Sequence, residues 1–186
     1  MPHTSTSQAA TRFAVPRGML VGFVIAALAT VLIALVNFRT AQVRAHAVEA
    51  MDETTATLRH LNLFLSSLKD AETGQRGYLL TGDDTYLQPY NLSLTALERN
   101  MARLKELTDD NAVQRRLVLQ IDDLRHEKLR ELAETIELRR SKGQEAAVAV
   151  TRNDSGRVMM DRIRDLASDL STLLNQQLEN DRKQWV

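Results

Sequence analysis

Residues 70–90 read DAETGQRGYLLTGDDTYLQPY, and this stretch places three glycines and one proline between segments with helical periodicity. Glycines at this density are typical either of a phosphate-binding loop or of a bend between helices. A dinucleotide-binding fingerprint follows a strand, and a P-loop requires Gly-Lys followed by Ser or Thr. Neither context is present. The stretch is therefore predicted to connect two helices.

The first half of the stretch combines polar residues with two glycines. If the preceding helix continues through it, Glu72 and Gln75 fall on the buried seam, and Glu72 can pair with Arg76 four residues later. Gly74 and Gly77 expose one face of the helix, which lets another backbone approach closely. Two roles fit this polar seam, setting the helix register and binding a ligand. Register-setting is the better attested role.

The second half has the signals of a turn into a new helix. Gly82 is expected to terminate the first helix, and Asp83 or Asp84 to cap the next. Pro89 then lies in the first turns, where its missing amide donor is least costly. Three tyrosines are expected to cover the bend: Tyr78, Tyr86 and Tyr90.

Apolar residues at three- and four-residue spacing surround this stretch, and no segment alternates with a period of two. Gly143 is expected to end the third helix, and a short helix with an Asn153-Asp154-Ser155-Gly156 turn leads into the last. The predicted helices run from about 43 through the opening stretch, over about 84–107 and 110–141, and from about 156 almost to the end. The fold class is therefore all-α, an antiparallel four-helix bundle.

Residues 18–36 read GMLVGFVIAALATVLIALV and carry no charge. At about 1.5 Å per residue, a helix of this length spans the hydrocarbon core of a bilayer. A buried core helix is rarely apolar on every face for so long. A cleavable signal peptide usually has a shorter apolar region that ends in a small-x-small site, and the following VNFRT is a poor cleavage site. We expect a retained N-terminal transmembrane helix that continues into the bundle.

The expected layout is a short cytoplasmic tail at 1–16, a transmembrane helix at 17–38 and an extracytoplasmic four-helix-bundle sensory domain at 39–184. Charge does not set the orientation, because Arg12 and Arg17 before the span are matched by Arg39 and Arg44 after it.

The composition excludes several kinds of site. Basic and acidic residues are balanced at 24 each, which gives no reason to expect a nucleic-acid partner. With no cysteine, disulfides and cysteine-based zinc sites are excluded. No metal-binding or cofactor-binding residues are expected.

No catalytic residues are expected either. His126-Glu127 faintly resembles the phosphoacceptor box of histidine kinases, but Lys128 stands where that box has an apolar residue. It also lacks the second histidine of a zinc protease motif. Adjacent carboxylates on a helix point in different directions. Asp122-Asp123 is therefore expected to be solvated, and Asp109-Asp110 to help start a helix. The chain is predicted not to be an enzyme.

Residues 70–90 resemble the signature of the class-three CHASE domain (cyclases/histidine kinases associated sensory extracellular). The resemblance extends to residues 128–164, KLRELAETIELRRSKGQEAAVAVTRNDSGRVMMDRIR, and covers about 40–180. The family signature and candidate switch are Asp70, Glu72, Thr73, Gly74, Gln75, Arg76, Gly77, Tyr78, Gly82, Tyr86, Pro89 and Tyr90. Leu79, Leu80 and Leu87 also match the family.

This resemblance implies the sensory input module of a bacterial transmembrane receptor of the histidine kinase, diguanylate cyclase or chemoreceptor type. It also implies a homodimer in the inner membrane, with the bundle in the periplasm or outside the cell, that responds to a small molecule or a protein. The sequence departs from such receptors, because it shows no second membrane helix and no output domain. The alternative is a membrane-anchored helical adaptor or structural protein that binds another protein and senses no ligand.

Overall fold

The computed structural model describes residues 17–151 and 154–183, and it divides the chain into two compact units, Met1–His46 and Ala47–Val186. Within the first unit the backbone is helical from Arg17, where helix α1 (Arg17–Thr81) begins. Its segment Val21–Arg39 has a mean hydropathy of 2.5 and no buried side chains. Of the helices in the described ranges, this is the one long and apolar enough to cross a membrane.

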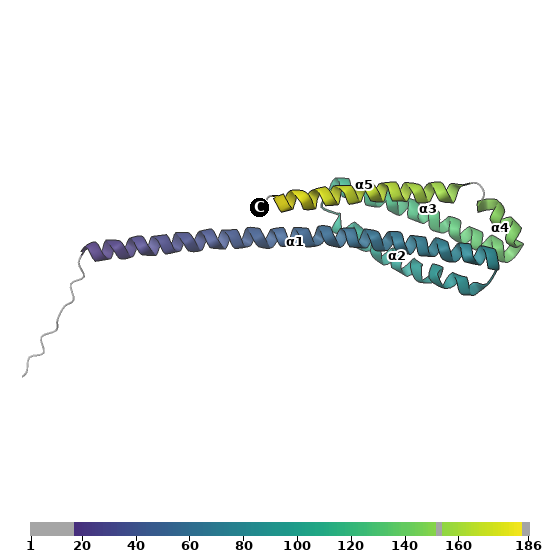
Figure 1. Ribbon diagram of the computed structural model, residues 1–186, viewed down its shortest axis with the longest axis horizontal. Coiled ribbons are helices and arrows are strands. Elements are labelled where there is room, and N and C mark those ends of the chain that lie inside the picture. Colours follow the sequence, from purple (N-terminus) through teal and green to yellow (C-terminus); the bar gives the residue numbers. More distant parts are fainter. Residues whose placement is uncertain (1–16, 152–153, 184–186) are drawn as a thin grey trace, which may run out of the picture. The chain divides into compact units, whose positions relative to one another are not determined.

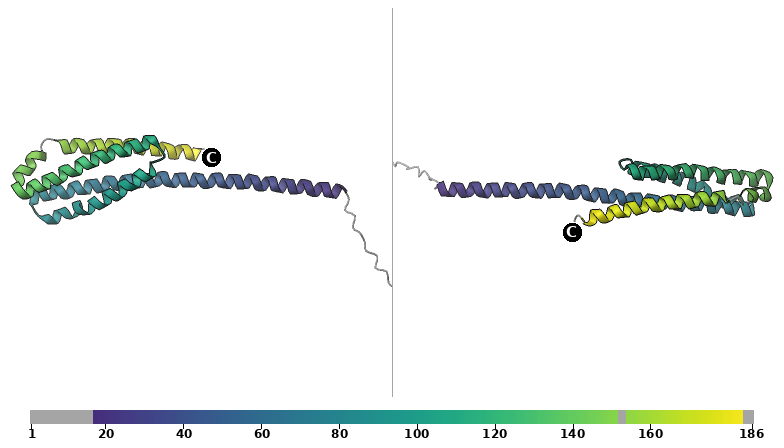
Figure 2. Two further views of the ribbon diagram at one scale, coloured as in Figure 1. Left: turned by 180° about the vertical axis from the view of Figure 1, so that it is seen from behind. Right: turned by 90° about the horizontal axis from the view of Figure 1, so that it is seen from above.

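The second unit is a bundle of helices, and no strand occurs in the part of it that is described. After the last turns of α1 come a 3₁₀ turn η1 (Asp84–Tyr86), α2 (Leu87–Leu107), α3 (Ala112–Lys142), α4 (Gln144–Thr151) and α5 (Ser155–Lys183). Within this unit, the C-terminal part of α1 and helices α2, α3 and α5 alternate in direction, and the short α4 lies at the end of the bundle where α3 finishes (Figures 1 and 2). The expected all-α antiparallel bundle is confirmed.

The core of the bundle follows the three-four spacing of the sequence. Each long helix buries one stripe of apolar residues, as amphipathic helices do. The fully or nearly buried set runs along the bundle: Leu61, Phe64, Leu68, Leu97, Met101, Leu104, Val118, Ile121, Met160, Ile163, Leu166, Ala167, Leu170 and Leu174.

A smaller apolar cluster closes the bundle at the α1–α2 bend. It consists of Tyr78, Leu79, Leu87, Ile136 and Ala147, with Tyr90 packed against it. Tyr78 is 4% exposed, whereas Tyr86 is 48% exposed. Two of the three tyrosines therefore cover the bend through this cluster.

Two helix ends match the glycine signals in the sequence. Gly82 (φ 74°) ends α1 and Gly143 (φ 84°) follows α3, both in the left-handed region that favours glycine. Asp83 accepts a hydrogen bond from the Thr85 amide and so caps the 3₁₀ turn η1, whereas α2 begins after Tyr86, which makes no side-chain capping hydrogen bond.

The start of α3 corrects the sequence-based prediction. Asp109-Asp110 was expected to start this helix, but the capping residue is Asn111, whose side chain accepts hydrogen bonds from the amides of Val113 and Gln114. Asn111 has the extended backbone that capping requires. Asp109 instead accepts a hydrogen bond from Arg115.

Candidate functional site

The polar residues of the signature lie on the buried seam of α1. Counting by three and four from the buried Leu68 reaches Glu72, Gln75 and Leu79, which are 8%, 2% and 4% exposed. The prediction that two polar residues interrupt this seam is therefore confirmed. Such residues require partners, because an unpaired polar group is costly to bury.

The two signature glycines allow the start of the next helix to approach α1. A Cβ added at Gly74 would lie 2.9 Å from both the Tyr86 carbonyl oxygen and the Tyr90 amide nitrogen. A Cβ at Gly77 would lie 2.5 Å from the Tyr86 ring. The close approach predicted from the glycines is confirmed. This close approach keeps the bend between α1 and α2 next to the polar seam of α1.

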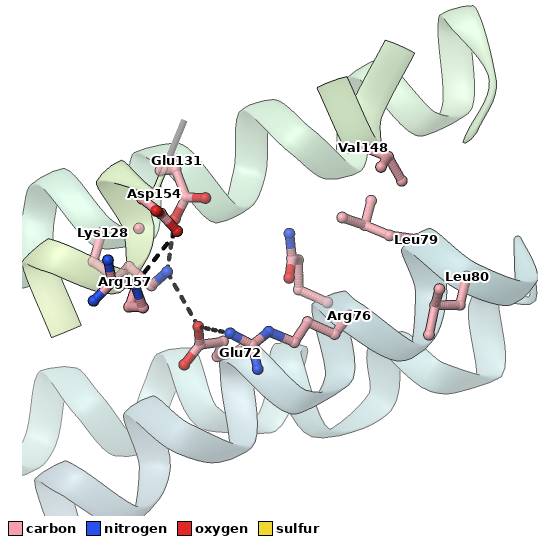
Figure 3. A pocket seen from close by; sticks show the side chains of 11 residues that line it. Glu72, Arg76, Leu79, Leu80, Lys128, Glu131, Val148, Asp154 and Arg157 are labelled. Atoms are coloured by element: carbon pink, nitrogen blue, oxygen red, sulfur yellow. Dashed lines mark hydrogen bonds and ion pairs between the residues drawn. The ribbon is translucent and has the colours of Figure 1, made fainter. Parts of the chain in front are cut away.

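Glu72 belongs to a layer of charges that includes two residues of α3. The Lys128 ammonium lies 2.8 Å from a Glu131 carboxylate oxygen and 3.5 Å from a Glu72 carboxylate oxygen. The Lys128 side chain is only 2% exposed. Arg76 approaches Glu72 to 2.8 Å from the outer side, and its own side chain is 68% exposed. Figure 3 shows this chain of ion pairs from Arg76 through Glu72 and Lys128 to Glu131.

Two uncharged features lie next to these charged residues: a hydrogen bond between two neutral side chains, and a glycine at which the backbone of α5 comes close to Lys128 and Glu131. Gln75 donates its Nε2 hydrogen to the Thr135 hydroxyl at 2.7 Å, which links α1 to α3. A Cβ at Gly156 would lie 2.8 Å from the Lys128 nitrogen and 2.9 Å from the Glu131 carboxylate. The absence of a side chain at Gly156 therefore leaves room for the Lys128–Glu131 pair at the start of α5.

A cleft of about 410 Å³ opens onto this layer. Part of its lining is Asp154, which has a left-handed φ of 57° and directly precedes α5. Three apolar side chains form part of its wall: Leu79, Leu80 and Val148. The polar lining consists of Glu72, Gln75, Arg76, Lys128, Glu131, Asp154 and Arg157, and Figure 3 shows both groups around the same space.

The structure brings together only part of the predicted signature set. Glu72, Gln75 and Arg76 line the cleft. Asp70 and Pro89 line a separate shallow groove between α1 and α2. The remaining signature residues contribute to the turn, the glycine contact or the apolar cluster, or are exposed: Thr73, Gly74, Gly77, Tyr78, Gly82, Tyr86 and Tyr90.

Sequence reasoning missed the other half of the cleft, which includes Lys128, Glu131 and Arg157. A signal for Lys128 was present. Ile121, Arg125, Lys128 and Leu132 follow one another at core spacing, and all four are buried. Charged residues at positions that the periodicity assigns to the core could have been identified as candidates.

A second buried charge network, on α2 and α3, overturns the expectation that Asp122 is solvated. Its side chain is 7% exposed, and it accepts a 2.7 Å hydrogen bond from Arg125, which is 2% exposed. Lys105 of α2 pairs with Asp122, and Glu98 of α2 pairs with Arg125. Burial acts to raise the pKa of Asp122, but the hydrogen bonds from Lys105 and Arg125 outweigh it and lower the pKa below 3.8. Asp123 is exposed, as expected.

His126 of α3 is largely accessible to solvent. Its side chain is 61% exposed. Within the described residues, no group of three or more His, Asp or Glu side chains is arranged to hold a metal ion.

Comparison with known proteins gives two findings. The family model described as the CHASE3 domain matches residues 47–184. The crystal structure of the Rhodopseudomonas palustris histidine kinase HK9 sensor domain superposes with a TM-score of 0.62 at 23% sequence identity, covering 67% of this chain and 97% of that one. This likeness supports the fold. A search of curated proteins found no match.

Proposed function

The chain belongs to the CHASE3 domain family and is a sensory input module, and on that premise we propose that the charge layer around Glu72 is its conformational switch. The observation that carries the proposal is the buried Lys128, placed between Glu72 and Glu131 and open to the cleft on one side. The module serves a bacterial membrane receptor whose output is of the histidine kinase, diguanylate cyclase or chemoreceptor type.

In the proposed receptor the apolar part of α1 is the membrane span, and the family resemblance supplies the orientation of the chain. Residues 17–38 cross the inner membrane, 1–16 remain in the cytoplasm, and 39–184 form the sensory bundle in the periplasm or outside the cell. The length and hydropathy of Val21–Arg39 support the crossing. The module acts as a homodimer, because a shift between two helices that cross the membrane together can carry a signal.

The charge layer suits a switch because its ion pairs have alternative partners. Lys128 lies closer to Glu131 than to Glu72, and Glu72 is shared with Arg76. A small movement of α1 along α3 would redistribute these contacts without leaving a buried charge unpaired. Packed helices interconvert between such discrete arrangements rather than deforming continuously. A stimulus that binds one arrangement better shifts the population towards it.

The test is a receptor in which this chain controls a histidine kinase output whose autophosphorylation is measured in membranes. Glu72→Gln removes the charge that Lys128 and Arg76 share, and the kinase activity is expected to change by about fivefold in either direction, which corresponds to a population shift of about 1 kcal/mol.

The matched control is Glu106→Gln, which breaks the exposed Arg103–Glu106 pair on α2 and leaves the charge layer intact. The control is expected to signal like the parent receptor. Equal kinase activity in the parent, Glu72→Gln and Lys128→Gln receptors, all present in membranes at equal amounts, would exclude the charge layer from signalling.

A further inference from the structure

We infer that the cleft is a binding site for a small organic carboxylate with an apolar body, held between Arg76 of α1 and Arg157 of α5. This inference rests on the proposed function, since it names the chemical class of the stimulus received at the same charge layer.

The buried charges are already neutralised. Lys128 is almost fully buried and is paired with both Glu131 and Glu72. These carboxylates are themselves only 16% and 11% exposed. A ligand ammonium would have to compete with Lys128 inside this layer, where separating a buried pair is costly.

Unlike the buried charges, the two arginines at the mouth of the cleft are largely exposed to solvent. The side chains of Arg76 and Arg157 are 68% and 63% exposed. Arg76 uses one terminal nitrogen on Glu72, and Arg157 makes long contacts of 3.3 Å to Asp154 and 3.5 Å to Asp161. A guanidinium has five N–H donors, so both groups retain donors for a ligand.

Exchanging these contacts for a ligand carboxylate costs little. Exposed ion pairs are worth only a small amount of stability. A carboxylate can accept two parallel hydrogen bonds from one guanidinium, which is the strongest geometry for such a pair. Arg157 lies on α5, beside the Glu131–Lys128 pair, while Arg76 lies on α1 beside Glu72 (Figure 3).

The apolar part of the lining indicates what the rest of the ligand, behind its carboxylate, should consist of. Leu79, Leu80 and Val148 offer an apolar surface, and Leu80 is 67% exposed without a ligand. The cleft volume of about 410 Å³ lies in the range of small-molecule sites. A ligand with a carboxylate at one end and several carbon atoms behind it would satisfy both parts of the lining.

Binding would act on the switch directly. Arg76 pairs with Glu72, and a ligand carboxylate that engages Arg76 would weaken its hold on Glu72. Glu72 would then depend more on Lys128, which draws α1 towards α3. The ligand would also connect α1 to the first turn of α5 through the two arginines.

The test measures binding to the full chain in lipid nanodiscs by isothermal titration calorimetry, with empty nanodiscs subtracted. Three probes with the same six-carbon chain differ in the head group and its charge: hexanoate, hexanamide and hexylammonium. Hexanoate is expected to bind at least about tenfold more tightly than hexanamide, and hexylammonium not to bind, because only the carboxylate is an anion that can form a bidentate ion pair with a guanidinium. Leucine and benzoate extend the panel to a zwitterionic and an aromatic carboxylate.

Matched arginine variants separate the site from general charge effects. Arg157→Gln is expected to weaken carboxylate binding by about tenfold, the usual scale for losing a charged hydrogen-bond donor. Arg164→Gln should have no effect, because Arg164 also lies on α5 and pairs with Asp161 but does not line the cleft. Arg76→Gln and the exposed Arg59→Gln form the corresponding pair on α1.

Two outcomes would overturn the inference. One is that no carboxylate of the panel binds at concentrations up to about 10 mM, beyond the millimolar range of weak affinity. The other is that binding is unchanged in both Arg76→Gln and Arg157→Gln. If either occurred while Glu72→Gln still altered kinase output, the proposed switch would stand and only the ligand class would fall.

Discussion

Lys128 is the residue on which the charge layer depends, because its ammonium separates two carboxylates that would otherwise face each other. Glu131 and Glu72 lie 2.8 Å and 3.5 Å from it, and water reaches only a small part of any of the three side chains. Methionine has a similar volume but no charge. Lys128→Met is therefore expected to destabilise the protein by about 3–5 kcal/mol, the scale for removing one partner of a buried ion pair. The measurement is the denaturant dependence of unfolding.

The control is Lys142→Met, which removes a lysine from the exposed last turn of the same helix. Its effect is expected to remain within about 0.5 kcal/mol. Restoring neutrality with Lys128→Met and Glu72→Gln together should recover part of the loss. Equal unfolding midpoints for Lys128→Met and the parent would mean that the layer does not need its cation.

At the scale of helices, the second charge network joins α2 to α3. This network predicts that the stability of the folded protein depends on pH. The pKa of Asp122 is lowered by hydrogen bonds from Lys105 and Arg125 despite its burial. A carboxyl whose pKa is lower in the folded state stabilises the fold above its unfolded pKa of about 3.9. That stability is lost as the pH falls through the lower folded pKa. Asp122→Asn is therefore expected to destabilise the protein near pH 7.

The difference in unfolding free energy between the parent and Asp122→Asn is expected to shrink as the pH falls below about 4, because the unfolded parent then binds a proton at Asp122 that the folded parent binds only at lower pH. Denaturant unfolding of the two proteins at a series of pH values measures this. Asp123→Asn provides the neighbouring control, because Asp123 is exposed and its replacement should have little effect at any pH. A difference for Asp122→Asn that stays constant down to pH values near 2, well below the unfolded pKa of about 3.9, would contradict the assignment.

At the scale of the whole molecule, the proposed anchor predicts how the chain is held in a cell. The side chains of Leu28 and Leu32 are 64% and 63% exposed on the apolar part of α1. An aspartate at the centre of a membrane helix costs about 2.5–3.5 kcal/mol. The double substitution Leu28→Asp and Leu32→Asp is therefore expected to prevent insertion. The chain should then be extracted by alkaline carbonate, while the parent remains with the membrane.

The corresponding control replaces two exposed leucines of the bundle. Leu92→Asp and Leu119→Asp add the same charge, but these positions are outside the apolar span. The control protein is expected to resist extraction like the parent. Resistance in the Leu28→Asp and Leu32→Asp protein would show that its apolar helix is not the membrane anchor.

The sequence predicted the backbone features of this protein better than it predicted which side chains meet. Gly82 and Gly143 end their helices as predicted, because a left-handed φ is a local property that glycine adopts without strain. The positions of Glu72 and Gln75 on the seam were also predictable, since they follow from counting along one helix. Asp122 was misjudged, because its partner Lys105 lies on another helix and no local pattern indicates that pairing.

The sequence by itself determined the helices, the apolar segment, the bend at residues 70–90 and the polar positions within the seam. These features depend on helical period, backbone freedom and residue type, all of which act over a few neighbouring residues. Only the tertiary structure decided that Glu72 meets Lys128 and Glu131, and that Arg157 joins Arg76 at the same cleft. Those neighbours are brought together by packing between helices that are distant in the chain. The signature residues are therefore one wall of a site whose other wall is formed by α3 and the first turn of α5.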